Sequence, residues 1–206
     1  MAAMYSKDCE SLSAYNARKK QINLPSENLK IIVKYNYLMI EFRQEHSGEL
    51  DSLKNFLFEH GPNQWNYLPE DGINKTFSLL ANNHGEALVA CDGETIIGLA
   101  IFFYPSALPE SFQKYAQSEP TIYIAEVVVH KDYAGRGIGS QLLNEIITKA
   151  PSLNATKVLL DRHEENAPSA GMMRKAGFVE ICTFSDLDRR LSGSRKTTVL
   201  GFDIVS

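Results

Sequence analysis

Hydrophobic residues fall into two kinds of pattern along the chain, and each kind predicts a different element. Runs rich in apolar residues at 86–91 and 95–104 lie on either side of Asp92 and Gly93. An Asp-Gly pair between two such runs is typical of a β-hairpin with a two-residue turn. The pattern therefore predicts two paired antiparallel strands in this part of the chain.

Helical spacing of apolar residues predicts two helices before this hairpin. Ser47 stands where an N-cap is expected, and the first helix should end before Gly61 and Pro62. Its inward-facing residues are Leu50, Leu53, Phe56 and Leu57. A second helix is predicted within residues 63–83, where three apolar residues share one face. These three are Ile73, Phe77 and Leu80.

The first forty residues carry weaker patterns. Residues 1–28 contain few large apolar side chains and are interpreted as an N-terminal extension. Residues 29–43 hold two apolar clusters separated by a polar step, which predicts a hairpin or an added edge strand.

Residues 122–150 give the strongest local prediction, a strand, a tight loop and a helix. The apolar, β-branched run at 122–129 reads as a strand. Three glycines follow at alternate positions, and helical spacing of apolar residues begins at once and stops before Pro151. The residues on that helical face are Ile138, Leu142, Leu143, Ile146, Ile147 and Ala150. The glycines are therefore predicted to lie at a helix N-terminus.

The last fifty residues predict a short helix between strands. Residues 158–160 read as a strand, and residues 166–178 as a short helix with Pro168 in its first turn and Gly177 after its end. Two further strands are predicted at 178–184 and 198–205.

Two loops are also predicted. Residues 105–120 are bounded by prolines and are interpreted as a polar, mobile loop that acts as a substrate lid. The charged segment at 185–196 is interpreted as a loop between the last two strands.

The alternating glycines have a physical meaning at a helix N-terminus. The first backbone N–H groups of a helix lack an intrahelical acceptor and carry the positive end of its dipole. Glycines at Gly135, Gly137 and Gly139 remove the Cβ atoms that would keep a diphosphate from these donors. The alternative is a glycine-rich turn that packs closely on a neighbouring element, because short glycine motifs have many false positives.

Two familiar phosphate motifs do not fit the spacing. A P-loop requires Lys and then Ser or Thr after its last glycine, whereas Gly139 is followed by Ser140 and Gln141. A dinucleotide fingerprint would begin directly at the end of its strand, but five residues separate Val129 from Gly135, and a third glycine at the required spacing is missing.

Composition narrows the class of protein. At 206 residues, with 44% hydrophobic and 22% charged residues, the chain is typical of one globular domain, and we expect residues 29–206 to form it. No apolar run approaches the length that spans a bilayer, so no membrane partner is expected. The formal charge of −4 provides no basic field for a phosphate backbone, so nucleic-acid binding is not expected.

Cysteine usage and the N-terminus bear on the compartment. The three cysteines are widely separated, form no zinc-like spacing and are odd in number. The first twenty residues lack the apolar region of a secretory signal. Both observations favour a reducing, cytoplasmic environment, and no metal is expected.

Two motifs in this chain resemble those of the GNAT family of N-acetyltransferases. The family's motif A reads Arg or Gln, two residues, Gly, one residue, then Gly or Ala, and residues 134–139 read AGRGIG after the strand-like VVVHKDY. Its motif B is an Asn, a short helix and a closing Gly-Phe, and residues 166–178 read NAPSAGMMRKAGF. Two positions depart from the family: Ala134 replaces the first Arg or Gln of motif A, and Met173 replaces the Tyr of motif B that protonates the departing thiolate.

The resemblance implies a fold. It is an α/β fold of the α+β kind, with a mixed, mostly antiparallel central sheet of about six to seven strands and about four helices. The sheet is splayed between strands four and five. Two closing antiparallel strands are also implied, and many members of the family pair through their late strands, so a homodimer is possible.

The resemblance also implies acetyl-CoA as cosubstrate and the residues that bind it. A bulge in the fourth strand would free backbone groups of the valines after Glu126 to pair with the pantetheine arm, while the glycine loop holds the diphosphate. Arg136 offers a guanidinium that partly substitutes for the one missing at Ala134. The implied cofactor-binding residues are Val127, Val128, Val129, Ala134, Gly135, Arg136, Gly137, Ile138, Gly139, Ser140, Asn166 and Ser169.

Transfer of an acyl group from a thioester to an amine needs a base, a polarised carbonyl and a proton for the thiolate. Glu126 is the only acid in the apolar strand and is the best candidate for the base, although it could instead pair with a substrate ammonium or a neighbouring arginine. Tyr123 is kept as a second catalytic candidate, even though in a regular strand it would face the other side of the sheet.

Met173 cannot donate a proton, so the proton donor is open. Tyr104, Tyr133 and Ser169 are candidates, and a thiol pKa of about 8.5 would also let the thiolate leave unprotonated.

The acceptor is indicated only in outline, as a primary amine of a small molecule, a peptide or a protein. Trp65 and Tyr67 could line its pocket, although aromatic residues of this kind are more often packing. Acids near the expected cleft lean slightly towards a cationic amine. These acids are Glu126, Asp161, Glu164 and Glu165.

Three classes of function are therefore weighed. The first is an acetyl-CoA-dependent N-acetyltransferase. The second is a binding or regulatory protein that responds to acyl-CoA and has lost its proton chemistry, in keeping with Ala134 and Met173. The third, a dinucleotide-binding enzyme, is disfavoured by the missing third glycine.

Overall fold

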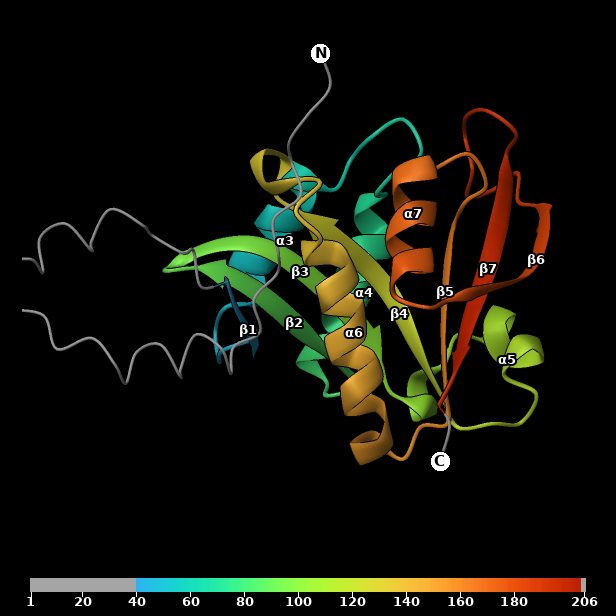
Figure 1. The fold of residues 1–206 in the computed structure, drawn as a ribbon, viewed down its shortest axis with the longest axis horizontal. Helices are drawn as coiled ribbons and strands as arrows, with labels where there is room; N and C mark the ends of the chain where they lie inside the picture. Colours follow the sequence, from blue (N-terminus) through green and yellow to red (C-terminus); the bar gives the residue numbers. More distant parts are fainter. Residues whose placement is uncertain (1–39, 205–206) are drawn as a thin grey trace, which may run out of the picture. The chain divides into compact units, whose positions relative to one another are not determined.

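The computed structural model describes residues 40–204, which form one seven-stranded sheet and five α-helices (Figure 1). The strands are β1 (Ile40–Gln44), β2 (Gly85–Asp92), β3 (Thr95–Phe103), β4 (Thr121–Val129), β5 (Lys157–His163), β6 (Val179–Ser185) and β7 (Lys196–Asp203). The helices are α3 (Leu50–His60), α4 (Glu70–Ala81), α5 (Glu110–Ala116), α6 (Ile138–Lys149) and α7 (Ala167–Lys175). The extension expected at 1–28 and its boundary with the domain lie outside the described residues, as does most of segment 29–43, where a hairpin or an added edge strand was expected. The described end of that segment belongs to β1, which is an edge strand of the sheet.

The sheet is mixed and mostly antiparallel, as predicted. Its strands follow the order β1-β2-β3-β4-β5-β7-β6, and only β4 and β5 run parallel. These two strands pair only over Thr121–Ile124 and Lys157–Leu160. Beyond Ile124 and Leu160 they separate, which confirms the expected splay and opens a gap in the middle of the sheet.

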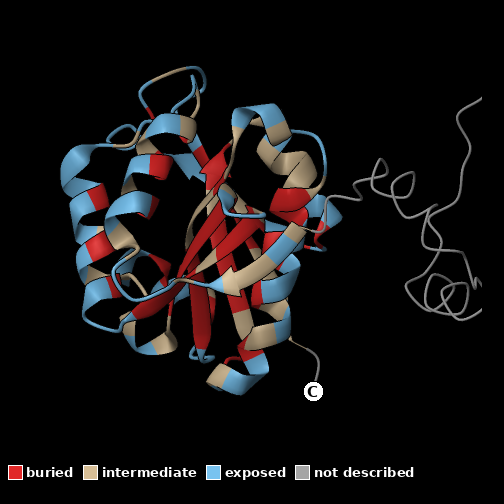
Figure 2. Ribbon diagram, turned by 90° about the vertical axis from the view of Figure 1, so that its left-hand side faces the viewer, coloured by how far each residue is buried: buried red, intermediate tan, exposed pale blue. Residues whose placement is uncertain are grey.

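Helices cover both faces of this sheet. α6 and α7 pack on one face, where Leu142, Ile146 and Met173 belong to one buried cluster. α3, α4 and α5 contribute to the cluster on the other face, with Leu53 and Phe77 among its residues. Figure 2 shows the buried residues along the central strands and on the inner sides of the helices. Among residues 40–204, no helix combines the length and apolar composition that crossing a bilayer requires.

A β-bulge interrupts β4 at Ala125. Ile101 of β3 is opposite Glu126, whereas the next residue of β3, Phe102, is opposite Ile124, so Ala125 is an extra residue in β4. Strand residues normally alternate between faces, and one extra residue reverses that alternation. Tyr123 and Glu126 therefore point to the same face of the sheet, and the expectation that Tyr123 would face the other side is wrong.

The expectation that residues 105–120 form a loop is also wrong. Residues Pro105–Ala107 form a turn of 3₁₀-helix and Glu110–Ala116 form α5. Phe112 of α5 is buried, and its ring centroid lies 4.3 Å from that of Tyr123. The helix has Pro109 before its first turn, an acid in the first turn and a lysine in the last, all of which favour a helix.

The helix ends match the sequence in part. Ser47 is not the N-cap of α3, because Glu49 occupies that position, and its carboxylate accepts hydrogen bonds from Arg43 and from the His46 N–H. At the end of α7, Gly177 has φ = 90°, as expected for a residue that closes a helix. The Phe178 N–H donates to the Met173 carbonyl across that turn, which completes the capping motif.

Candidate active site

The gap between β4 and β5 forms a cleft of about 1040 Å³. One wall carries the second half of β4, the loop at 133–140 and α7. The opposite end is lined by the α3–α4 loop, α5 and residues 188–191 of the β6–β7 loop. The cleft is thus continuous from the glycine loop to a second, separate set of loops.

The glycine loop has the backbone that its sequence predicts. Gly135 and Gly137 have φ values of 79° and 83°, which glycine adopts without the strain that a side chain would add. α6 begins at Ile138 without a side-chain cap, and its first intrahelical bond runs from the Gln141 N–H to the Gly137 carbonyl. The N–H groups before Gln141 therefore lack an intrahelical acceptor and can bind an anion.

Gly139 has a different reason to be glycine. A Cβ there would lie 2.4 Å from Sδ of Met172 in α7, so its absence allows α6 and α7 to pack closely. Ser140 donates from its hydroxyl to the Met172 carbonyl at 3.1 Å, and the side chain of Ile138 is buried in the core. Gly139 and Ser140 thus fix α6 against α7, while Ile138 anchors α6 in the core, and only the backbone groups of the three remain for a ligand. The sequence left two explanations for the glycines, anion binding and close packing, and close packing explains Gly139.

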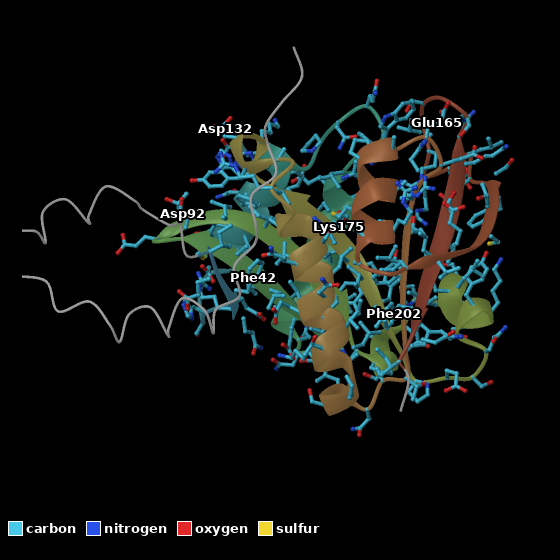
Figure 3. The ribbon with its side chains drawn as sticks, viewed as in Figure 1. Phe42, Asp92, Asp132, Glu165, Lys175 and Phe202 are labelled. Atoms are coloured by element: carbon cyan, nitrogen blue, oxygen red, sulfur yellow. The ribbon has the colours of Figure 1, made fainter. Side chains whose placement is uncertain are left out.

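The cation beside the loop is Lys175, which sequence reasoning missed. The Lys175 ammonium lies 3.4 Å from the position that a Cβ would take on Gly137, and Figure 3 shows this residue between α6 and α7. Arg136 instead stacks on Tyr133 at 4.6 Å and donates to the Asp132 carbonyl at 3.1 Å. Its guanidinium does not line the cleft, whereas Ala134, Gly135 and Lys175 do. The signal for Lys175 was its place in the last helical turn before Gly177.

Backbone groups of β4 face the cleft at alternate residues. The His130 N–H donates to Ile97 of β3, and pairing with β3 alternates along the strand, so Val128 also directs its N–H and C=O towards β3. Val127 and Val129 direct theirs to the other side, where β5 has separated. Of the three valines expected to hold a pantetheine arm, only these two can offer backbone groups to a ligand.

Asn166 and Ser169 both line the cleft at the start of α7. The Asn166 side chain accepts a hydrogen bond from the Ser169 N–H at 3.1 Å, so it caps the helix. The Ser169 hydroxyl lies 3.8 Å from Sδ of Met173, which is buried.

Two of the proton donors considered for the thiolate are engaged elsewhere. The Tyr104 hydroxyl donates to Glu86 at 2.7 Å, and Tyr104 does not line the cleft. The Tyr133 hydroxyl donates to Asp92 at 2.8 Å, at the β2–β3 turn. Ser169 also lines the cleft, and its hydroxyl makes the long contact with Sδ of Met173.

Glu126 lines the cleft immediately after the bulge. Protein atoms crowd its carboxyl group although the residue keeps some contact with the open cleft. Burial raises the pKa of Glu126 to about 8, and the negative charge of Asp161 adds to this effect. A carboxyl group with a pKa close to neutral is suited to accept a proton from an amine.

Tyr123 belongs to a buried charged cluster beside Glu126. Its hydroxyl donates to Asp161 at 2.6 Å, and burial raises the pKa of Tyr123 well above its ordinary value. Asp161 also accepts hydrogen bonds from Arg189, at 2.8 Å, and from Arg190. Tyr123 therefore keeps its proton and holds Asp161 in place, while Glu126 is the group that can change its charge.

Trp65 and Tyr67 both line the far end of the cleft. The Trp65 ring lies 4.7 Å from that of His163, and His163 contacts the Ser192 carbonyl at 3.0 Å. Glu164 and Glu165 do not line the cleft. Trp65 thus joins the α3–α4 loop to β5, whereas Tyr67 is exposed.

The family model for the acetyltransferase (GNAT) family matches residues 50–178 of the chain. No curated protein matches the chain by sequence.

Solved structures share the fold at low sequence identity. A Bacillus subtilis acetyltransferase in complex with CoA is 18% identical, with a TM-score of 0.60, over 81% of this chain and 99% of its own. A Drosophila melanogaster polyamine N-acetyltransferase is 18% identical, with a TM-score of 0.61, over 80% and 99%. A ribosomal-protein-alanine N-acetyltransferase from Brucella melitensis is 22% identical, with a TM-score of 0.60, over 79% and 99%.

Proposed function

The chain belongs to the GNAT family of acetyltransferases, and we propose that it transfers the acetyl group of acetyl-CoA directly to a primary amine of a small molecule or peptide. The observation that carries this proposal is the joining, in one cleft, of an anion-binding loop, an open strand edge and Glu126. The solved relatives named above include a CoA complex and enzymes for polyamine and protein amines, which supports both the cosubstrate and the acceptor class.

The residues present fit acetyl-CoA. Its diphosphate suits the free N–H groups at the start of α6, where Gly137 leaves room and Lys175 supplies a positive charge. The amide groups of its pantetheine arm suit the backbone of Val127 and Val129. When bound, acetyl-CoA supplies an acetyl group already activated as a thioester.

Glu126 accepts the proton in the proposed reaction. The amine nitrogen forms a bond to the carbonyl carbon, the bond from that carbon to sulfur breaks, and the proton lost by nitrogen goes to Glu126, directly or through a water. A backbone N–H of the open β4 edge stabilises the negative charge that develops on the carbonyl oxygen. The departing sulfur takes a proton from solvent, and Ser169, which lines the cleft beside Met173, can donate a hydrogen bond to the thiolate.

Two measurements test this proposal. Calorimetric titration with acetyl-CoA should show saturable binding, and thiol release should depend on an added amine. A panel of polyamines, amino acids and peptides with free N-termini provides the acceptors. Binding without acceptor-dependent thiol release would favour the alternative, a regulatory protein that binds acyl-CoA. An absence of binding would refute the proposal.

A further inference from the structure

The acidic side chains that were expected to attract a cationic acceptor are mostly paired with basic residues or lie outside the cleft. Asp161 is almost fully buried, with 3% of its side chain exposed, and it pairs with two arginines. Glu164 pairs with Lys196 at 3.7 Å, and Glu165 accepts a hydrogen bond from the Ser194 N–H at 2.7 Å. Glu126 holds a proton at neutral pH, so it offers no lasting negative charge to a second ammonium group.

Arg189 is the half-exposed charge at this end of the cleft. One of its terminal nitrogens donates to Asp161 at 2.8 Å, and the other forms an ion pair with Asp186 at 3.6 Å, which is too long for a hydrogen bond. The side chain is 47% exposed, so several of the five N–H donors of its guanidinium remain available. Arg190 differs, because it is buried and also donates to Thr197.

A side recess opens beside Arg189, between the α3–α4 loop and the β6–β7 loop, with a volume of about 360 Å³. Arg189 and Leu191 form one wall, and Trp65 and Tyr67 form the other. No acid lines this recess within the described residues 40–204, and Asp188 borders only the main cleft. Tyr67 and Leu191 are more than half exposed there, so the entrance combines a positive charge with apolar surface.

We infer that the acceptor is an amino acid with an apolar side chain, whose carboxylate pairs with Arg189 and whose side chain enters the side recess. This rests on the proposed function, since the amino group must then lie beside Glu126. Arg189 lines both the main cleft and the recess, so one guanidinium can hold the carboxylate where the two meet. Planar guanidinium donors match a carboxylate in a bidentate manner.

The test compares acceptors that differ only in the carboxylate. L-Leucine and L-leucinamide form one pair, L-phenylalanine and L-phenylalaninamide a second, and spermidine is the cationic comparison. Wild-type protein should favour each acid over its amide in kcat/KM by about tenfold or more, the usual size of a charged hydrogen bond. Arg189→Gln should reduce that ratio about tenfold, and Arg189→Lys should retain part of it. The amine pKa differs within a pair, so each kcat/KM is referred to the concentration of unprotonated amine, and any remaining difference cancels when the wild-type ratio is divided by the variant ratio.

A matched control is Lys196→Gln, which removes a nearby charge outside the cleft and should leave the acid-to-amide ratio unchanged. If Arg189→Gln does not fold, the acid-to-amide ratios of the wild type and of Arg189→Lys still test the inference. Should no acceptor turn over, L-leucine is titrated by calorimetry into the CoA-saturated protein, and binding that is absent from the Arg189 variant supports the inference.

Opposite outcomes are separable. Turnover that prefers the amides or spermidine overturns the acceptor class and leaves the acetyltransferase proposal standing, as does an Arg189→Gln variant with an unchanged ratio. Absence of L-leucine binding to the CoA complex, where no acceptor turns over, also overturns it. Protein that does not bind acetyl-CoA refutes the proposed function and this inference together.

Discussion

Replacement of Glu126 by glutamine should alter both the pH dependence of stability and that of catalysis. In the folded protein the pKa of Glu126 is about 8, against an ordinary value of 4.5. Between these two pH values the folded state holds a proton on Glu126 that the unfolded chain has lost, so the contribution of Glu126 to stability is greatest below pH 4.5 and is lost as the pH rises to 8. At about 1.4 kcal/mol per pKa unit, the full loss is about 5 kcal/mol, an upper bound because the cleft admits water.

Glutamine resembles the protonated acid and cannot lose a proton. Denaturant unfolding of wild type and Glu126→Gln should therefore give similar free energies at pH 5, whereas at pH 9 the variant should be the more stable by up to about 5 kcal/mol. Other titrating groups are common to both proteins and cancel in the difference. A difference that stays within about 1 kcal/mol from pH 5 to pH 9 would refute the reasoning.

The same substitution should lower turnover at least about 100-fold, the usual loss of a general base. In wild type, kcat/KM should rise with pH up to about 8 and then level off, because the base must be unprotonated. Two acceptors of different amine pKa separate this limb from the ionisation of the acceptor itself. If the pH at which kcat/KM levels off changes only with the pKa of the acceptor amine, Glu126 is not the base.

Three further predictions concern the loop, the helix contact and the charged cluster. Lys175→Ala should weaken acetyl-CoA binding about tenfold in calorimetry with little effect on kcat, whereas Arg136→Ala, the matched loss of a charge outside the cleft, should change it less than about twofold. Equal effects of the two variants would contradict the assignment. Gly139→Ala should lower the free energy of unfolding by about 1–3 kcal/mol, because its Cβ would lie 2.4 Å from a methionine sulfur; unchanged denaturant unfolding would contradict this. Asp161→Asn should lower the pKa of Glu126 and move the rising limb of kcat/KM to lower pH, and an unmoved limb would contradict that coupling.

Sequence reasoning located the elements whose signals are local. The glycine loop and the start of α6 follow from backbone requirements within about ten residues, and the end of α7 follows from one glycine. α5 was missed because the two prolines around residues 105–120 were interpreted as loop signals, although Pro109 precedes a helical first turn.

The features that were missed depend on contacts between distant segments. The family resemblance implied a bulge in this strand, but its place at Ala125 is set by the register of β4 against β3, which an unbroken apolar run does not reveal. The place of Lys175 depends on how closely α6 approaches α7, which Gly139 sets. Asp161 was expected to attract a cationic acceptor, because the sequence does not show that it pairs with arginines. The partner Arg189 comes from a loop 28 residues further along the chain.

The extra residue at Ala125 also bears on how this cleft can be gained or lost. Bulges bend the strand that carries them, and here the pairing of β4 with β5 ends at Ile124, directly before the bulge. A gene lacking the single codon for Ala125 would keep every neighbouring side chain on its present face, since the remaining residues would alternate regularly. We expect such a shortened β4 to run straight and remain hydrogen-bonded to β5 along its length. The side chains of the site would then all be present, but the cleft between them would be too narrow for any substrate.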